Sequence, residues 1–153
     1  MIDSFPQISE GVSAVDQIML LRAILKGSAS TIHEPLVLHR QGGITGFKAK
    51  DVYQKISRLK RDSKRTIADI SQMILDATSV GQDKVVFNRF RRYLLAADYI
   101  SKILSANSFS EKIKLLYQFK HIPITKRIRF FSYATCAPFL NIFWSIKALF
   151  IKA

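Results

Sequence analysis

The sequence predicts a mainly helical protein with a short β segment, and three observations lead to this prediction. Apolar residues recur at three- and four-residue steps through most of the chain after residue 47. Before them, the run STIHEPLVLHR (30–40) has the length and β-branched content of one or two strands. The 153-residue chain is 48% hydrophobic with few Pro and Gly, which suits one folded domain.

The first predicted helix covers SAVDQIMLLRAILKG, residues 13–27. Ser13 is placed to cap its amino end, with Asp16 three residues later as the partner of a capping box, and Gly27 is placed to end it. Its apolar residues are too many for a one-sided stripe, so we expect this helix to be largely buried.

The predicted β segment follows, broken at Glu34-Pro35, where proline disfavours helix and removes a backbone donor. The next stretch, QGGITGF, is a predicted loop with three glycines. Helical periodicity then runs from about residue 48 to a break at 80–81, from 86 to 104, and from Ser110 to about residue 120. Proline at position 123 interrupts the last of these helices.

Charge divides the chain into two regions. Residues 1–46 contain three basic and four acidic side chains, whereas residues 47–153 contain 21 basic and seven acidic ones, so the second region accounts for the net charge of +13. Such a field attracts a polyanion: nucleic acid, an anionic membrane surface or a phosphate-bearing substrate. Cys136 is the single cysteine and the first ten residues show no signal-peptide pattern, which predicts a reducing, cytosolic location.

An uncharged run of 17 residues, 130–146, lies near the carboxyl end. This length is at the short limit for a helix that crosses a membrane, about 17–25 residues, so we predict a segment that lies on the membrane surface. The predicted membrane contacts are basic and aromatic side chains: Lys126, Arg127, Arg129, Tyr133 and Trp144. The alternative is a core helix covered by its neighbours.

The order of features in the first 46 residues resembles the carboxy-terminal part of the catalytic domain of family 2 glycosyltransferases, inverting GT-A enzymes that use nucleotide-sugar donors. The matching features are Val15-Asp16 at the start of the helix through LLRAILKG, the strand EPLVLHR, and QGG after it. The resemblance implies that residues 1–46 are the carboxy-terminal remnant of an α/β GT-A domain. Residues 47–124 are then a basic helical extension, and residues 125–153 the membrane-associating segment.

Asp16 is the catalytic residue that the resemblance implies. An inverting transfer needs a carboxylate that accepts the proton of the acceptor hydroxyl, and Asp16 matches the family's base. Val15 stands where the family usually has a second acid. A capping box with Ser13 is the alternative role of Asp16.

The loop after the strand supplies the predicted substrate-binding residues, His39, Arg40, Gly42 and Gly43. A cation and backbone amides beside the leaving diphosphate lower the barrier to transfer, and a glycine-rich loop can close over the donor. The alternative is that Arg40 is a surface charge at the end of a strand and that the glycines form a turn.

No metal site is predicted within this chain, because His33, Glu34 and His39 lack the spacing of a zinc site. The intact enzyme is expected to use a divalent cation, Mg²⁺ or Mn²⁺, held by an Asp-x-Asp motif of its nucleotide-binding half. This sequence contains no Asp-x-Asp. We therefore expect that the chain alone neither binds the donor tightly nor transfers sugar.

The sequence thus predicts part of a glycosyltransferase of cell-surface polysaccharide or lipopolysaccharide biosynthesis, peripheral on the inner face of the cell membrane. Its expected partners are a nucleotide-sugar donor, a lipid-linked acceptor and an anionic membrane surface. The alternative is a non-enzymatic basic helical protein that binds anionic membrane or nucleic acid. Nucleic acid is the less favoured partner, because the basic residues alternate with an apolar stripe as on ordinary solvated helices.

Overall fold

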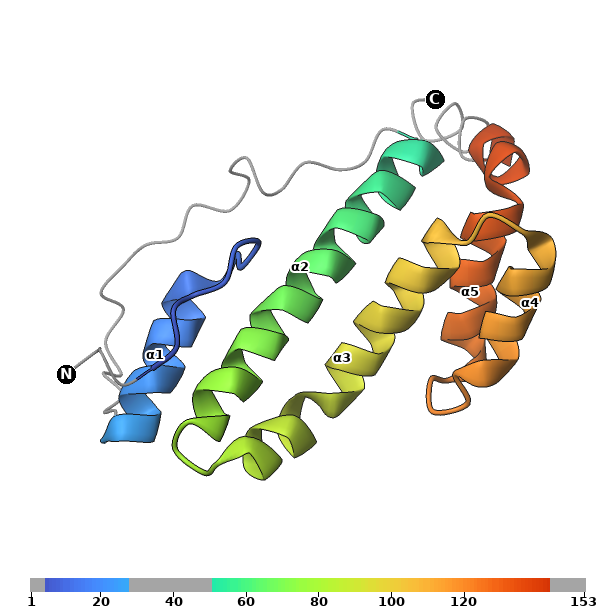
Figure 1. Ribbon diagram of the computed structural model, residues 1–153. Helices are drawn as coiled ribbons and strands as arrows, with labels where there is room; N and C mark the ends of the chain where they lie inside the picture. Colours follow the sequence, from blue (N-terminus) through green and yellow to red (C-terminus); the bar gives the residue numbers. More distant parts are fainter. Residues whose placement is uncertain (1–4, 28–50, 144–153) are drawn as a thin grey trace, which may run out of the picture.

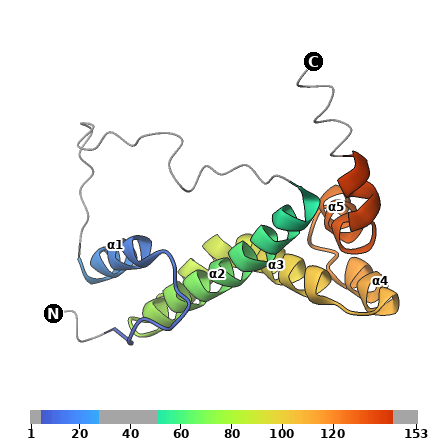
Figure 2. The same cartoon turned by 90° about the horizontal axis from the view of Figure 1, so that it is seen from above.

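The computed structural model describes residues 5–27 and 51–143. They form five main helices and a short helix at 137–143 (Figure 1). The main helices are α1 (Val15–Lys26), α2 (Val52–Thr78), α3 (Asp83–Ser105), α4 (Phe109–Gln118) and α5 (Ile124–Thr135). Helices α2 and α3 form a long hairpin, with α1 beside one end of it and α4 and α5 at the other end (Figure 2).

The prediction of a mixed fold with a short β segment is wrong for the part of the chain that the structure describes, where all regular structure is helical. Instead of lying on a sheet, α1 packs on α2, because its buried side chains meet apolar and acidic partners on that helix. The run at 30–40, where we placed the strands, lies outside the described residues.

The turn between α2 and α3 depends on Gly81. Its φ of +71° lies in the left-handed region, which residues with a side chain rarely adopt. The amide of Gln82 then donates a hydrogen bond to the carbonyl of Ala77 at 2.8 Å and closes the end of α2. The predicted break at 80–81 is confirmed.

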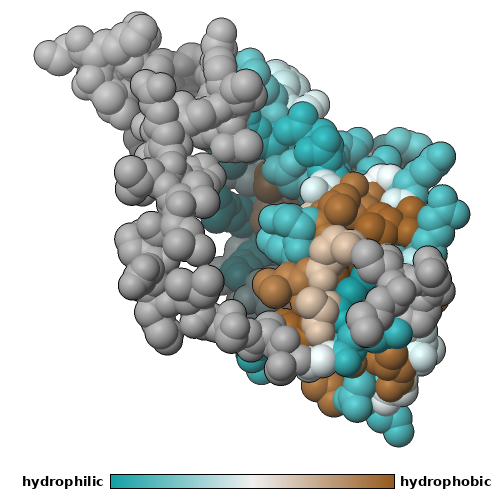
Figure 3. Space-filling model, turned by 90° about the vertical axis from the view of Figure 1, so that its left-hand side faces the viewer, coloured by the Kyte–Doolittle hydropathy of each residue, from teal (hydrophilic) through white to brown (hydrophobic). Residues whose placement is uncertain are grey.

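Helix α1 packs on the carboxyl half of α2 along one side only. Ile18 joins Met73, Ala77 and Val86 in a buried group that we call the α1 cluster. Several other apolar side chains of α1 are 38–56% exposed: Val15, Met19, Leu20 and Ile24. Figure 3 faces this side of the molecule and shows hydrophobic residues at the surface among hydrophilic ones. The prediction of a largely buried helix is therefore wrong, because α2 covers a single face of α1.

A buried ion pair holds α1 to α2. Arg22 Nε lies 2.6 Å from Asp76 Oδ2, and Arg22 Nη2 donates to Asp76 Oδ1 at 2.9 Å. Arg22 Nη2 also donates to the carbonyl of Pro6 at 2.6 Å. Gln72 donates to Asp76 Oδ1 and accepts from both the amide and the hydroxyl of Ser9. Among the described residues no buried side-chain nitrogen or oxygen lacks a partner, so this network is fully satisfied.

The opposite end of the hairpin carries a second buried group, the α4–α5 cluster: Tyr99, Ile103, Leu104, Leu115, Phe119 and Ile122. The Tyr99 ring lies 5.3 Å from that of Phe119, centre to centre, and its hydroxyl donates to the carbonyl of Arg127 at 2.8 Å. Burial raises the pKa of Tyr99, and the charge of Arg127 opposes this with a smaller effect. Tyr99 therefore joins α3 to α5 by both packing and hydrogen bonding.

A side-chain hydrogen bond and a proline mark where α4 and α5 begin. The Ser108 hydroxyl accepts from the amide of Glu111 at 3.1 Å, so α4 begins before the predicted cap, Ser110. Pro123 directly precedes α5, which confirms the predicted interruption of the helical pattern.

Proline also ends α5. Pro138 has no N–H and its ring clashes with the carbonyl four residues earlier, that of Ala134, so α5 stops at Thr135. Lys112 Nζ donates to the Ala134 carbonyl at 2.8 Å and replaces the missing helical donor. The uncharged run that we identified in the sequence is thus divided between α5 and the helix at 137–143.

Replacing Arg22 with Met tests the importance of the buried ion pair. This change leaves the Asp76 carboxylate, which is fully buried, without its cation, and we expect the free energy of unfolding to fall by about 3–5 kcal/mol. As a control, Asp98→Asn removes the exposed Lys102–Asp98 pair and should change it by less than about 1 kcal/mol. Urea denaturation of both variants measures the difference, and equal effects would contradict the assignment.

Candidate functional site

The clearest candidate site is an apolar surface on α4 and α5. Phe109, Ile113 and Tyr117 follow one another at four-residue steps along α4, so they share one side of the helix. All three are exposed, Tyr117 to 67%. The opposite side of α4 provides Leu115 and Phe119 to the α4–α5 cluster. The exposed stripe is therefore additional to the face that packs in the core.

Helix α5 continues this surface. Ile124, Ile128 and Phe131 share one side of α5, and the first two are each 51% exposed. The Phe131 ring contacts the ring of Phe109 with centres 5.9 Å apart. Since α4 and α5 run antiparallel, this contact brings the two stripes side by side.

We call this joint surface the apolar hairpin face: Phe109, Ile113, Tyr117, Ile124, Ile128 and Phe131. Exposed apolar side chains continue along the chain into the helix at 137–143, where Phe139, Ile142 and Phe143 are 60–77% exposed. Clusters of this kind mark surfaces that bind a protein, a ligand or a membrane.

Exposed cations lie next to the apolar hairpin face. They are on α4, on the turn after it and on α5: Lys114, Lys120 and Arg129. Of the predicted membrane contacts, Arg129 is thus exposed beside it, whereas Lys126 is exposed on the opposite side of α5. Arg127 has another position, since its guanidinium donates to the carbonyls of Leu116 at 2.6 Å and Ile122 at 3.0 Å. Arg127 braces the α4–α5 connection from within.

Tyr133 lies half-buried on the side of α5 that meets the α4–α5 cluster. Lys55 Nζ and the Arg129 guanidinium lie over its ring, 5.4 Å and 5.9 Å from the ring centre. Burial raises the pKa of Tyr133, but hydrogen bonding and attraction from Arg129 and Lys55 together outweigh it, so the pKa lies below its ordinary value. Trp144, the other predicted aromatic contact, lies outside the described residues.

Asp16, the predicted catalytic residue, is exposed in the first turn of α1. The capping box with Ser13 does not form. Instead Asp69, on α2, accepts from the Ser13 amide at 2.6 Å, the Ser13 hydroxyl at 2.9 Å and the Ala14 amide at 3.1 Å. A carboxylate of another helix therefore binds the backbone directly before α1, and the Asp16 carboxylate has no hydrogen bond or ion pair with the described residues.

Sequence reasoning missed Asp69 and Asp76, which hold α1 in place. Both lie on the side of α2 that also carries Ile70 and Met73, at a spacing of seven residues. The sequence signal that could have identified them is the presence of acidic side chains on the apolar side of a basic helix. The predicted substrate-binding residues lie outside the described residues: His39, Arg40, Gly42 and Gly43.

Two searches of the described residues gave negative findings. In residues 5–27 and 51–143, no three or more His, Cys, Asp or Glu side chains gather closely enough to hold a metal ion. None of the described helices combines the length and the hydrophobicity that a membrane crossing requires.

The chain matches no protein-family model, no curated protein and no solved structure. A functional proposal therefore rests on the chemistry of its own residues.

Substituting the two carboxylates near the start of α1, Asp69 and Asp16, distinguishes a carboxylate that stabilises the fold from one that does not. Asp69→Ala removes the hydrogen bonds to Ser13 and Ala14 directly before α1 and should lower the free energy of unfolding by about 1–2 kcal/mol. Asp16→Asn should lower it by no more than about 0.5 kcal/mol, since it removes only a favourable charge near the helix dipole. Urea denaturation measures both, and a larger loss in Asp16→Asn would return that residue to a structural role.

Proposed function

We propose that this protein binds anionic membrane surfaces through the apolar hairpin face. The observation behind the proposal is the juxtaposition of exposed Phe, Ile and Tyr side chains on α4 and α5 with exposed Lys and Arg around them. Apolar side chains enter the boundary between headgroups and acyl chains, and the cations remain beside the lipid phosphates. The protein is then peripheral, on the inner face of the cell membrane.

The size of the two contributions supports this proposal. Full burial of an Ile or Phe side chain is worth about 1.5–3 kcal/mol, and each Lys or Arg near an anionic surface adds about 1 kcal/mol. The apolar hairpin face offers five side chains that are at least 36% exposed, so partial burial of several of them is sufficient for binding.

Nucleic acid fits this surface less well. Phosphate contacts use cations and hydrogen-bond donors, and the aliphatic Ile113, Ile124 and Ile128 supply neither. A membrane, in contrast, supplies an apolar phase that these side chains can enter.

Vesicle flotation tests the membrane proposal. Ile128→Glu places a negative charge in the middle of the apolar hairpin face and should weaken binding to phosphatidylglycerol-containing vesicles at least about tenfold, because one apolar contact is lost and a charge repels the lipid. Val85→Glu is a matched control, since Val85 is 65% exposed on α3, outside this face.

Circular dichroism establishes that both variants remain helical. Equal binding of the two variants, or no binding of the unmodified protein, would exclude the apolar hairpin face as the membrane contact.

The second candidate is the sugar transferase that the sequence resembles, with Asp16 as its base. What supports it is that the Asp16 carboxylate is exposed in the first turn of α1 and has no hydrogen bond or ion pair with the described residues. The adjacent residue, Gln17, lines a cavity of about 400 Å³ together with Thr66, Arg89 and Tyr93. Polar groups beside an aromatic face are suited to a sugar acceptor.

In this proposal the donor is a nucleotide sugar, the acceptor is lipid-linked, and a divalent cation is bound by the part of the enzyme that also binds the nucleotide. Membrane binding by α4 and α5 then keeps the transferase close to its acceptor. The two proposals are compatible, and each has its own test.

Asp16→Asn tests the catalytic assignment in an enzyme that contains this chain together with its nucleotide-binding half. A lost general base typically costs about 10²–10⁴-fold in turnover, and we expect a loss of that order with little change in donor affinity. Asp83→Asn, in the first turn of α3, is the control and should keep normal turnover. Normal turnover in Asp16→Asn would reject the assignment.

A further inference from the structure

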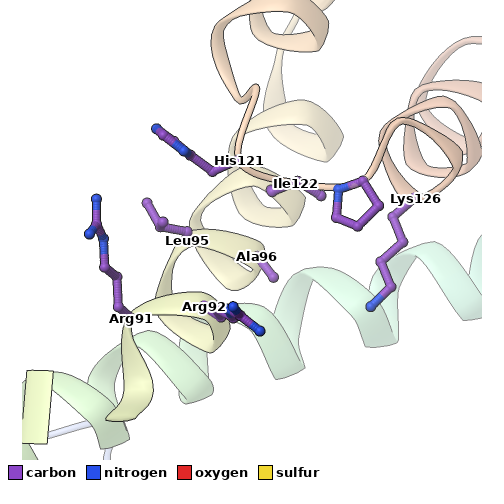
Figure 4. Close-up of a pocket in the computed structure, with 8 residues that line it drawn as sticks. Arg91, Arg92, Leu95, Ala96, His121, Ile122 and Lys126 are labelled. Carbon is purple, nitrogen blue, oxygen red and sulfur yellow. The ribbon is translucent and has the colours of Figure 1, made fainter. Parts of the chain in front are cut away.

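A cationic cavity lies between α3 and the start of α5, apart from the apolar hairpin face. Its volume is about 570 Å³, and it is lined by eight residues: Arg91, Arg92, Leu95, Ala96, His121, Ile122, Pro123 and Lys126. Figure 4 shows Arg91 and Arg92 extending from α3, and His121 and Lys126 coming from the α4–α5 connection and from α5. Side chains about 30 residues apart in sequence thus meet around one space.

Among the described residues that line this cavity, none is acidic. Arg91, Arg92 and Lys126 carry positive charges, and His121 is a fourth basic side chain. Within the described residues, Arg91, Arg92, His121 and Lys126 make no hydrogen bond or ion pair. The nearest acid along α3, Asp98, is already bound to Lys102 at 2.8 Å. Cations of like charge repel one another, so an anion between them lowers the energy of the site.

The backbone that carries these basic side chains is held in place by contacts of other residues. Ile122 is buried in the α4–α5 cluster, and Arg127 Nε binds its carbonyl at 3.0 Å. Tyr99, on α3, donates to the carbonyl of Arg127. The connection that bears His121 and Lys126 is therefore fixed against the helix that bears Arg91 and Arg92, and the ligand need not organise it.

We propose that this cavity binds a phosphate-bearing ligand, either a diphosphate or a phosphomonoester. Guanidinium groups match phosphate oxygens with two parallel hydrogen bonds each, and Lys126 adds a point charge. The volume lies within the range of about 300–1,000 Å³ that is usual for small-molecule sites, so it accommodates more than a single phosphate group.

This inference does not depend on membrane binding or on sugar transfer. Ile124 and Ile128 of the apolar hairpin face lie on the side of α5 opposite Lys126. Ile128→Glu should therefore leave ligand binding in the cavity unchanged, so the proposals for the two sites are tested independently.

Calorimetric titration of the whole chain with inorganic diphosphate tests the site. We expect saturable binding of one diphosphate per chain, weakened at least about tenfold in the double variant Arg92→Gln and Lys126→Gln, which removes two of the charge-assisted contacts. The matched control is Lys64→Gln with Lys84→Gln, which loses the same charge from exposed positions outside the cavity and should bind within about twofold of the unmodified protein.

Absence of saturable binding, or an equal loss in both double variants, would overturn the proposal. All the substituted side chains are exposed, and circular dichroism establishes that the variants are folded.

Vesicles then identify the source of the phosphate. If a lipid headgroup is the ligand, phosphatidic acid vesicles bind better than phosphatidylglycerol vesicles of equal charge, and the Arg92 and Lys126 double variant loses this preference. If a free compound is the ligand, diphosphate binds as expected while the two vesicle types bind equally. Either result supports the cavity as a phosphate site.

Discussion

The buried pairing of Arg22 with Asp76 determines how the amino-terminal part of this protein is arranged. An unpaired carboxylate in the interior is strongly unfavourable, so α1 must lie where its arginine reaches α2. The same guanidinium binds the carbonyl of Pro6, which draws the segment before α1 over the same surface. Asp69, two helical turns before Asp76, then binds the amides of Ser13 and Ala14 directly before α1. One charged side chain in an apolar helix thus positions both α1 and the segment before it.

The helices could be predicted from sequence more completely than their packing. Periodicity, Gly81 and Pro123 located α2, α3 and the interruption after α4, because these signals act within a few residues. The mixed fold is a wrong prediction for the described residues, which are helical; it rested on the length and β-branched content of one short run, 30–40, which lies outside them. The partner of Arg22 lies 54 residues away, and periodicity within one helix contains no information on contacts at that distance.

For the candidate sites too, the residue types could be predicted from the sequence, but their arrangement in space could not. Basic and aromatic residues near the carboxyl end were visible in the sequence, but the directions in which their side chains point were not. Lys126 and Arg129 are exposed, with Lys126 lining the cationic cavity and Arg129 over the Tyr133 ring, whereas the guanidinium of Arg127 binds backbone carbonyls. The Phe109 stripe went unpredicted because its significance appears only when α5 lies beside it. The cationic cavity depends on four side chains from two places in the chain, which again only the packing brings together.

The two buried clusters lie at opposite ends of one helical hairpin, and they differ in size. Among the described residues, the α4–α5 cluster has six buried members including two aromatic rings, whereas the α1 cluster has four and relies on polar contacts as well. Regions with few buried apolar side chains open more readily than the rest of a protein. We therefore expect the backbone amides of α1 to exchange with solvent through local opening more readily than those around Tyr99.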